Sequence, residues 1–291
     1  MGCFVSKKKG LIDDTLENSR ANEKFPFPRR NNTWDRLTLQ HYLFRYIWQS
    51  NFSSPVQESI KNENVKILDV GSGSGPWALE MAGEFPNALF TKLDSSKTSQ
   101  QNSTTLPNLI IKDYDFSKLE PLPFKDSTFD FIHVGFLASE LPEKQFQTLV
   151  NELVRTLKPG GYLEIMDVDF QGGNEGPSAQ RLMSSLRSYY LSRDINPLIT
   201  PKLEPIMKST KCLDNVTGQK TLHPLGDWDE KIGELALLNW LQMLNDLKPV
   251  MAPFMGISDF EYRNLIQEFK HEVDIFQTYW ISTRVYGRKI Q

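Results

Sequence analysis

A glycine-rich turn between an apolar strand and an apolar helix is the feature that most restricts the fold of this chain. The segment reads ILDVGSGSGPWALEMA and covers residues 67–82. Strand-like apolar runs then alternate with helical ones, and strands are predicted at residues 65–70, 87–94, 108–115, 129–136, 162–168 and 278–288. Alternation at this spacing is typical of a parallel sheet with helices on both faces. The pattern therefore predicts an α/β, doubly wound, Rossmann-like fold.

Helical periodicity and chain composition define the remaining organisation. Helices are predicted within residues 33–52, 145–157, 231–244 and 258–276, and the last opens with a capping box, Ser258 and Glu261. Residues 1–30 are polar and lack periodicity, so we predict a disordered tail followed by one domain over residues 31–291. Residues 172–256 follow the fifth predicted strand and carry amphipathic helices with Leu186, Tyr189 and Tyr190. We interpret them as a lid on the substrate side.

The spacing of the glycines argues against a nicotinamide cofactor. Dinucleotide-binding turns read G-x-G-x-x-G, whereas here Gly71, Gly73 and Gly75 alternate. Asp69 precedes the turn, where a carboxylate would repel a pyrophosphate but suits an ammonium group. Asp94 lies 19 residues after Gly75, at a strand end where a carboxylate can bind both ribose hydroxyls. A nucleoside joined to a positively charged group fits these residues, and S-adenosylmethionine is such a molecule.

Several motifs in the right order resemble one family. ILDVGSGSG, LDSS, KDYDF, FDFIHVGF and LVRTLKPGGYLEIMDVD resemble the successive motifs of class I S-adenosylmethionine-dependent methyltransferases, over residues 33–291. RLTLQHYLFRYIW, NEGPSAQRL and TYWISTRVYGRK resemble a fungal branch related to secondary-metabolism methyltransferases and regulators. The resemblance implies a seven-stranded sheet whose last strand is antiparallel.

The resemblance also implies which residues hold the cofactor. Asp94 would bind the ribose diol, while Asp115 would hold the adenine amino group and Phe116 would cover its ring. Asp113 is the alternative to Asp115, because the strand register is open by two residues. The full implied set is Asp69, Gly71, Ser72, Gly73, Gly75, Asp94, Ser95, Asp113, Asp115, Phe116 and His133.

A general base is needed only if the methyl acceptor must lose a proton. His133, at the end of the fourth predicted strand, and Glu140 are the candidates. Relatives of this branch often carry an arginine two residues after that histidine, whereas this chain has Gly135. We expect His41 and Tyr42 to pack in the core.

The chain indicates the class of acceptor only broadly. HVGFLASELP follows the fourth strand in place of an Asn/Asp-Pro-Pro-Tyr-type tetrapeptide, which disfavours the amines of nucleic-acid bases. A net charge of −3 without a basic stripe also argues against a nucleic-acid partner. Cys3 and Cys212 lack metal-ligand spacing, so no metal is predicted. A small, rather apolar acceptor is the leading hypothesis, and a cofactor-binding regulator acting through protein partners is the alternative.

The first residues, MGCFVSKKK, carry a separate signal. Gly2 and Ser6 fit the myristoylation pattern, and Cys3 could take a palmitoyl chain. Three lysines follow and would add attraction to an anionic membrane surface. Because no apolar run is long enough to span a bilayer, we expect a cytosolic protein attached peripherally to the inner face of a membrane. A charged tail that matches a short pattern by chance is the alternative.

Overall fold

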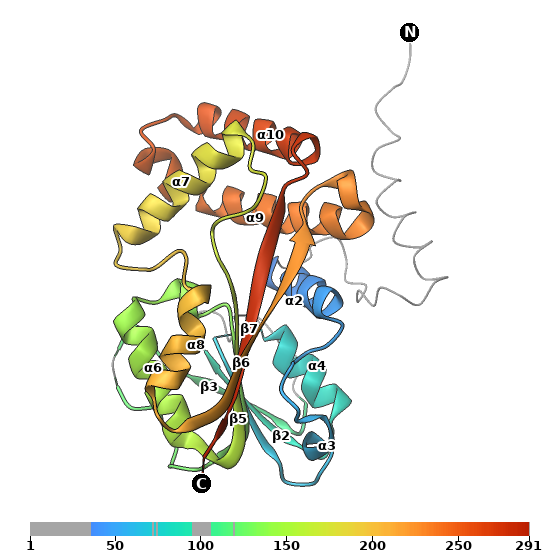
Figure 1. The fold of residues 1–291 in the computed structure, drawn as a ribbon, viewed down its shortest axis with the longest axis vertical. Coiled ribbons are helices and arrows are strands. Elements are labelled where there is room, and N and C mark those ends of the chain that lie inside the picture. The colour runs from blue at the N-terminus through green and yellow to red at the C-terminus, as the bar shows by residue number, and fades with distance from the viewer. Residues whose placement is uncertain (1–35, 72, 74, 95–105, 119, 291) are drawn as a thin grey trace.

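The computed structural model describes residues 36–71, 73, 75–94, 106–118 and 120–290, which form a seven-stranded sheet flanked by helices (Figure 1). The strand order is β3-β2-β1-β4-β5-β7-β6. β7 is antiparallel to both of its neighbours, whereas the pairs from β3 to β5 are parallel. The strands are β1 (Lys66–Val70), β2 (Leu89–Asp94), β3 (Leu109–Asp113), β4 (Phe129–Gly135), β5 (Leu157–Val168), β6 (Leu213–Pro224) and β7 (Tyr279–Lys289).

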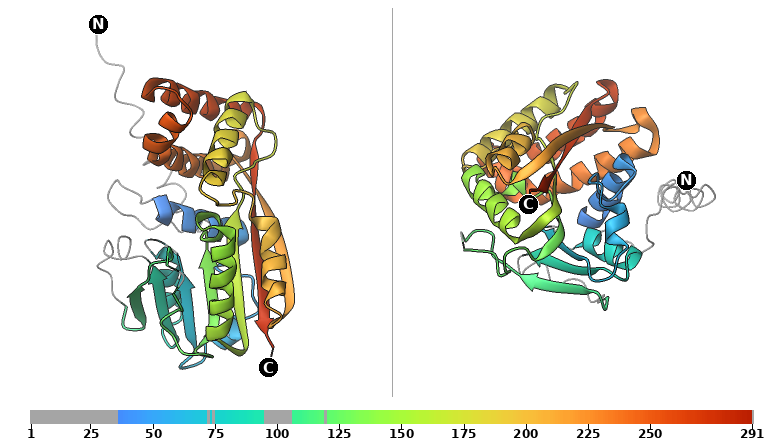
Figure 2. Two further views of the ribbon diagram at one scale, coloured as in Figure 1. Left: turned by 90° about the vertical axis from the view of Figure 1, so that its left-hand side faces the viewer. Right: turned by 60° about the horizontal axis from the view of Figure 1, so that its bottom comes forward.

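Helices cover both faces of the sheet and one end of it (Figures 1 and 2). α6 and α8 pack on one face, α3 and α4 pack on the other, and α7, α9 and α10 form a helical layer beyond one end of the sheet. The helices are α2 (Arg36–Trp48), α3 (Gln57–Ile60), α4 (Pro76–Glu84), α6 (Glu143–Thr156), α7 (Pro177–Leu191), α8 (Thr200–Ser209), α9 (Glu230–Phe254) and α10 (Asp259–Ile275), with short 3₁₀ turns η2 (Ala138–Glu140) and η3 (Asp227–Asp229).

The predicted fold class is confirmed, and so is its antiparallel last strand. β6 was not located in the sequence, because only its last two residues are buried and its exposed stretch shows no apolar alternation. α9 extends ten residues beyond the predicted end, because Pro249 and Pro253 lie within the helix and do not stop it. The capping box of α10 is present, with the Ser258 hydroxyl accepting from the Glu261 amide.

The range 172–256 contains more than helices above a cavity. β6 is a full strand of the sheet, and α8 packs its apolar side against the same core as β5. α7 and α9 belong instead to the helical layer, together with α10. Within residues 172–256, only α7 and α9 among the described helices and strands supply side chains to the main cavity. That the whole range forms a lid stays a prediction.

A buried ion pair ties α2 to the sheet. Glu164 on β5 accepts hydrogen bonds from the Ser54 amide at 2.7 Å and hydroxyl at 2.6 Å, and its carboxylate lies 3.8 Å from Arg284 Nε on β7. The Arg284 guanidinium stacks on Trp48, whose indole N–H donates to the Ser282 hydroxyl at 2.9 Å. Burial lowers the pKa of Arg284 to about 10. These contacts fix the C-terminal end of α2 against the sheet.

Candidate functional site

The carboxyl ends of the parallel strands open into a cavity of about 570 Å³ beneath the helical layer. Ligands of doubly wound sheets bind at this edge, and the volume is that of a small-molecule site. The glycine turn, the ends of β2 and β4 and the loop after β3 line one side of the cavity, where Gly71, Gly73, Asp94, Asp115, Phe116 and His133 lie. α2, the end of β5, α7 and α9 line the other, with Arg36, Gln40, Phe170, Tyr190, Met243 and Leu247.

Gly71, Gly73 and Gly75 of the turn after β1 all have positive φ, and the first two line the cavity. Gly71 and Gly73 have φ values of +74° and +60°, in the left-handed region that side chains disfavour. A Cβ on Gly71 would lie 2.8 Å from Leu137 Cδ2, and one on Gly73 would overlap Leu37. The bare backbone therefore forms the wall of the cavity. Gly75 caps α4 and does not line the cavity.

Lys92 braces this turn from below, and sequence reasoning missed it. Its side chain is 2% exposed, and its ammonium donates a hydrogen bond to the Gly73 carbonyl. Burial lowers the pKa of Lys92, while the nearby carboxylates Asp94, Asp69 and Asp113 oppose that shift. The sequence did contain a signal for this contact. Lys92 lies two residues before the aspartate that ends β2, so both side chains are on the same face of the strand.

The structure separates the two aspartates between which the sequence did not decide. Both side chains are exposed, but Asp113, which pairs in register with Asp94 across β2 and β3, does not line the cavity. Asp115 and Phe116 do line it, beside Asp94, whose side chain is 6% exposed. Hydrogen bonds from Ser117 lower the pKa of Asp115. The cavity thus brings together Asp94, Asp115 and Phe116.

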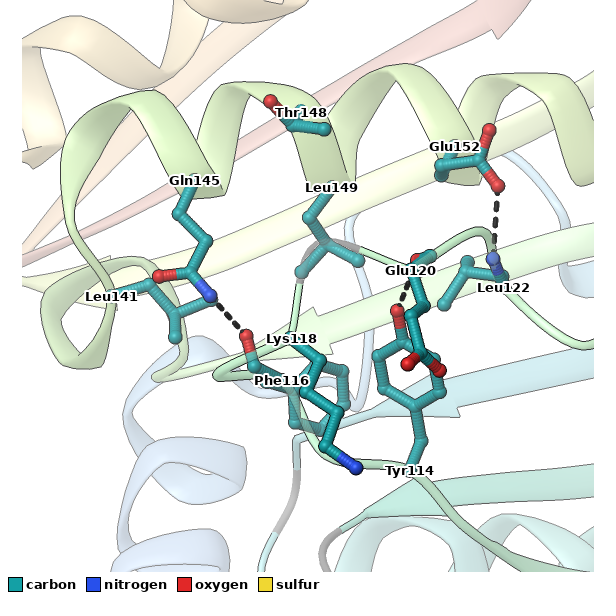
Figure 3. A pocket seen from close by; sticks show the side chains of 10 residues that line it. All are labelled: Tyr114, Phe116, Lys118, Glu120, Leu122, Leu141, Gln145, Thr148, Leu149 and Glu152. Atoms are coloured by element: carbon teal, nitrogen blue, oxygen red, sulfur yellow. Dashed lines mark hydrogen bonds between the residues drawn. The ribbon is translucent and has the colours of Figure 1, made fainter.

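The loop that carries Asp115 and Phe116 is fastened to α6 (Figure 3). The Gln145 side chain donates to the carbonyl of Phe116, and Glu152 accepts from the Leu122 amide at 2.9 Å. The space between loop and helix is a hollow of only about 20 Å³. This hollow has room for about one water molecule and is too small for a ligand. The two hydrogen bonds hold the loop against α6.

His133 lies on the cavity wall in a fixed orientation. β1 and β4 place it in register with Asp69, and its Nδ1 lies 3.0 Å from Asp69 Oδ1. Its ring stacks on Trp77, with centroids 4.1 Å apart and planes 5° apart. Its Nε2 is buried and has no hydrogen-bond partner among the residues that the structure describes. Asp69 itself is 1% exposed behind the wall and does not line the cavity, so it reaches a ligand only through the turn and His133.

Two further acids lie at the end of the fourth and fifth strands. Glu140 lines the cavity, and its side chain is partly exposed to solvent although many protein atoms surround the carboxylate. Desolvation raises the pKa of Glu140, against the opposing charges of Arg36 and Arg193. Burial raises the pKa of Asp167 to about 7, although the amides of Ser139 and Val168 donate to it. Asp167 does not line the cavity.

Residues that are distant from the glycine turn in the sequence complete the site. The structure changes two expectations, the core position of His41 and the grouping of Tyr189 with Tyr190. His41 lines the cavity instead of packing wholly in the core, with its Nε2 2.6 Å from Glu80 Oε2. Burial lowers the pKa of His41, and Glu80 opposes this. Tyr190 lines the cavity, whereas its neighbour Tyr189 packs on Phe254. Periodicity cannot distinguish adjacent tyrosines on a helix whose register against the sheet is unknown.

Some of the sequence-based candidates lie outside the described residues. These are Ser72, Ser95, Gly2 and Cys3. Across residues 36–290, apart from the gaps given above, no group of three or more His, Cys, Asp or Glu side chains could hold a metal ion. Within the same residues, no helix is both long and apolar enough to cross a membrane.

Comparisons with known proteins agree with this geometry. A family profile described as a methyltransferase domain matches residues 67–161. Methyltransferase str3 of Strobilurus tenacellus is 29% identical over 68% of this chain and 69% of its own length. The secondary metabolism regulator laeA of Aspergillus niger is 22% identical over 84% of this chain and 65% of its own length.

A solved structure shares the fold. The phosphoethanolamine N-methyltransferase 2 of Haemonchus contortus, in complex with S-adenosylhomocysteine, superposes with a TM-score of 0.50 at 17% identity. The superposition covers 90% of this chain and 59% of that one. The family profile includes the glycine turn, Asp94, Asp115, Phe116 and His133, but it includes none of the cavity residues from α2, α7 or α9.

Proposed function

Because the chain is a class I S-adenosylmethionine-dependent methyltransferase, we propose that it methylates a small, largely apolar molecule bound between the glycine turn and α7 and α9. The observation that carries this proposal is the two-sided cavity. One side presents backbone, carboxylates and His133, and the other presents Phe170, Tyr190, Met243 and Leu247 together with the polar residues Arg36, Gln40 and Asp246. Polar groups orient a nucleoside, whereas apolar groups bury an acceptor and exclude water.

The residues present fit the cofactor. Two glycines leave no room for side chains at the wall, and a carboxylate that is 6% exposed ends β2 where ribose hydroxyls can reach it. Asp69, buried behind the turn, makes the region unfavourable for a pyrophosphate and favourable for an ammonium group. We therefore assign the turn to the methionine portion, Asp94 to the ribose, and Asp115 with Phe116 to the adenine.

The chemistry divides between cofactor and protein. When bound, S-adenosylmethionine supplies a methyl group on a positively charged sulfur that leaves as a neutral thioether. The chain aligns the acceptor with that methyl group and keeps water out. For an acceptor that must lose a proton, His133 and Glu140 are the proposed bases. Because its pKa is raised, the Glu140 carboxylate is a stronger proton acceptor than that of an exposed glutamate.

Turnover with a methyl-labelled donor tests the proposal. Incubation with an extract of small molecules is expected to give labelled product. Tyr190→Ala is expected to lower turnover at least about tenfold while leaving donor affinity within about twofold, because Tyr190 lies on the proposed acceptor wall and off the glycine turn. Thermal unfolding checks that the variant is folded, since Tyr190 also packs on Phe170. Tyr189→Ala, on the neighbouring residue that packs on Phe254, is the matched control and is expected to act like the wild type. Equal loss of donor affinity in Tyr190→Ala would show that this wall does not belong to the acceptor.

The second candidate function is regulatory, and the likeness to laeA favours it. In that case the cavity would bind the cofactor while protein partners receive the signal. The labelled-donor experiment separates the two. Donor binding without any labelled small molecule, together with a labelled or stably bound protein when a protein extract of the same cells is used, would favour the regulator.

We also propose that the first nine residues anchor the protein to the inner face of a membrane. Gly2 would carry a myristoyl chain and Cys3 a palmitoyl chain, with Lys7, Lys8 and Lys9 beside them. One chain binds only reversibly, so the second chain and the lysines strengthen attachment.

Cell fractionation tests this attachment. The wild type is expected in the membrane fraction and Gly2→Ala in the cytosolic fraction, because only the former can be myristoylated. Attachment requires that Met1 be the translational start, so the intact mass of the N-terminal peptide is measured first. Lys7→Ala is the control that removes one charge and keeps both acylation sites. A wild type that fractionates like Gly2→Ala would refute the anchor.

A further inference from the structure

A small, mostly apolar recess that contains a few polar side chains opens beside the main cavity, between α2, β6 and α9. It has a volume of about 30 Å³ and shares Arg36, Gln40 and Phe170 with the main cavity. His223 from β6 and Asn239 from α9 line only the recess. The recess has no residue in common with the glycine turn and none with the strand end that carries His133.

Of the four polar side chains that line the recess, Arg36 and Gln40 bond to each other, whereas His223 and Asn239 carry buried atoms without partners among the described residues. His223 is 2% exposed, and neither ring nitrogen has a hydrogen-bond partner among the described residues. Asn239 is 8% exposed, and its Oδ1 likewise has none. Phe44 lies edge-on to His223, with ring centroids 5.3 Å apart. Leaving such groups unsatisfied is costly, and a polar group of a ligand that enters the recess would remove that cost.

The chemistry of the pair defines what it can bind. Burial lowers the pKa of His223 to about 4, so at neutral pH its ring is uncharged, with one donor and one acceptor nitrogen. Asn239 Oδ1 only accepts. A hydroxyl group can accept from the imidazole N–H and donate to Asn239, whereas a carbonyl can do only the first. His223 and Asn239 carry no charge at neutral pH, and Arg36 faces Asp246 at 3.6 Å, so the pair itself favours a neutral group.

We propose that the recess binds a hydroxyl group at the far end of the methyl acceptor, so that the acceptor is an alcohol or phenol with an apolar body. The inference rests on the proposed function and adds the substrate class. The apolar body lies against Phe170, Tyr190 and Met243, and the hydroxyl in the recess anchors the molecule. The hydroxyl is not the atom that is methylated, because the recess lies apart from the glycine turn and His133.

Binding of two matched probes tests the recess without requiring turnover. The full chain, saturated with S-adenosylhomocysteine, is titrated with 4-ethylphenol and with 4-ethyltoluene, which differ by a hydroxyl in place of a methyl group. The wild type is expected to bind the phenol at least about tenfold more tightly, because a site built for a hydroxyl rejects the analogue that lacks one. His223→Phe and Asn239→Leu are each expected to abolish that preference.

A control and a stability measurement separate this role from a structural one. Gln242 lies on the same helix as Asn239, and its Oε1 is also buried without a partner, but it lines neither cavity. Gln242→Leu is therefore expected to keep the preference. His223→Phe and Asn239→Leu are expected to melt at the same temperature as the wild type or higher, since apolar replacements remove unsatisfied groups.

Two results would overturn the proposal. One is equal affinity of the wild type for both probes, and the other is a preference that survives in both recess variants. A failure of the proposed function looks different, because it would give no labelled product while the probe preference remains measurable.

Discussion

Replacing Asp94 with alanine is expected to weaken binding of S-adenosylhomocysteine by about 30- to 150-fold. The carboxylate ends β2 at 6% exposure on the cavity wall, where it can accept hydrogen bonds from ribose hydroxyls. Hydrogen bonds to a buried charged group contribute about 2 to 3 kcal/mol in such a site, which corresponds to that change in Kd. Isothermal calorimetry on the purified chain measures it directly.

Asp113→Ala is the matched control for this prediction. The residue is of the same type and pairs in register with Asp94 on the adjacent strand, but it is exposed and off the cavity wall. We expect its affinity to stay within about twofold of the wild type, because no ligand contact is removed. Equal losses in the two variants would mean that general charge near the sheet edge, and not a ribose contact, determines affinity. Tighter binding of NAD than of S-adenosylhomocysteine would contradict the cofactor assignment itself.

The largest expected effect on stability comes from Glu164→Ala. The substitution leaves Arg284, which is 2% exposed, without its carboxylate, and it removes the acceptor of the Ser53 and Ser54 amides. Breaking a buried pair from one side costs about 3 to 5 kcal/mol, because the remaining charge stays buried. The melting temperature is expected to fall on the order of 10 °C. Denaturant titration and thermal unfolding measure both quantities.

Two further variants make the comparison interpretable. Glu164→Gln keeps an oxygen that can accept from the Ser54 amide and is expected to unfold between the wild type and Glu164→Ala. Glu58→Ala removes the same side chain from an exposed ion pair with Lys61, 2.7 Å long, and is expected to leave the midpoint unchanged. If Glu164→Ala unfolded at the wild-type midpoint, the ion pair would not hold α2 to the sheet.

The sequence predicted those parts of the molecule whose signals are local. β1, β2 and β4 are apolar runs, and the turn between β1 and α4 is marked by its glycines. The cap of α10 is fixed by Ser258 and Glu261 alone. β6 was not predicted because it is held by backbone pairing with β7, 55 to 76 residues later, as Thr221 with Ser282 illustrates. Nothing in its own composition reports that pairing.

The candidate site divides in the same way. Asp94 ends β2, Asp115 follows β3 and His133 lies near the end of β4, so their meeting at one edge of the sheet was predictable from topology. Tyr190 and Met243 reach the cavity from helices whose placement depends on tertiary packing. The recess around His223 depends on β6, the strand that local signals did not indicate.

The cavity's two walls have different origins along the chain, and this affects how such proteins can diversify. The residues proposed to hold the methyl donor all lie within residues 67–161, whereas Arg36, Tyr190 and Met243 are contributed by the flanking segments. Substitutions in the flanks can therefore change the acceptor wall while the residues proposed to hold the donor stay the same. Related enzymes can in this way act on new acceptors while they keep the same methyl-transfer reaction.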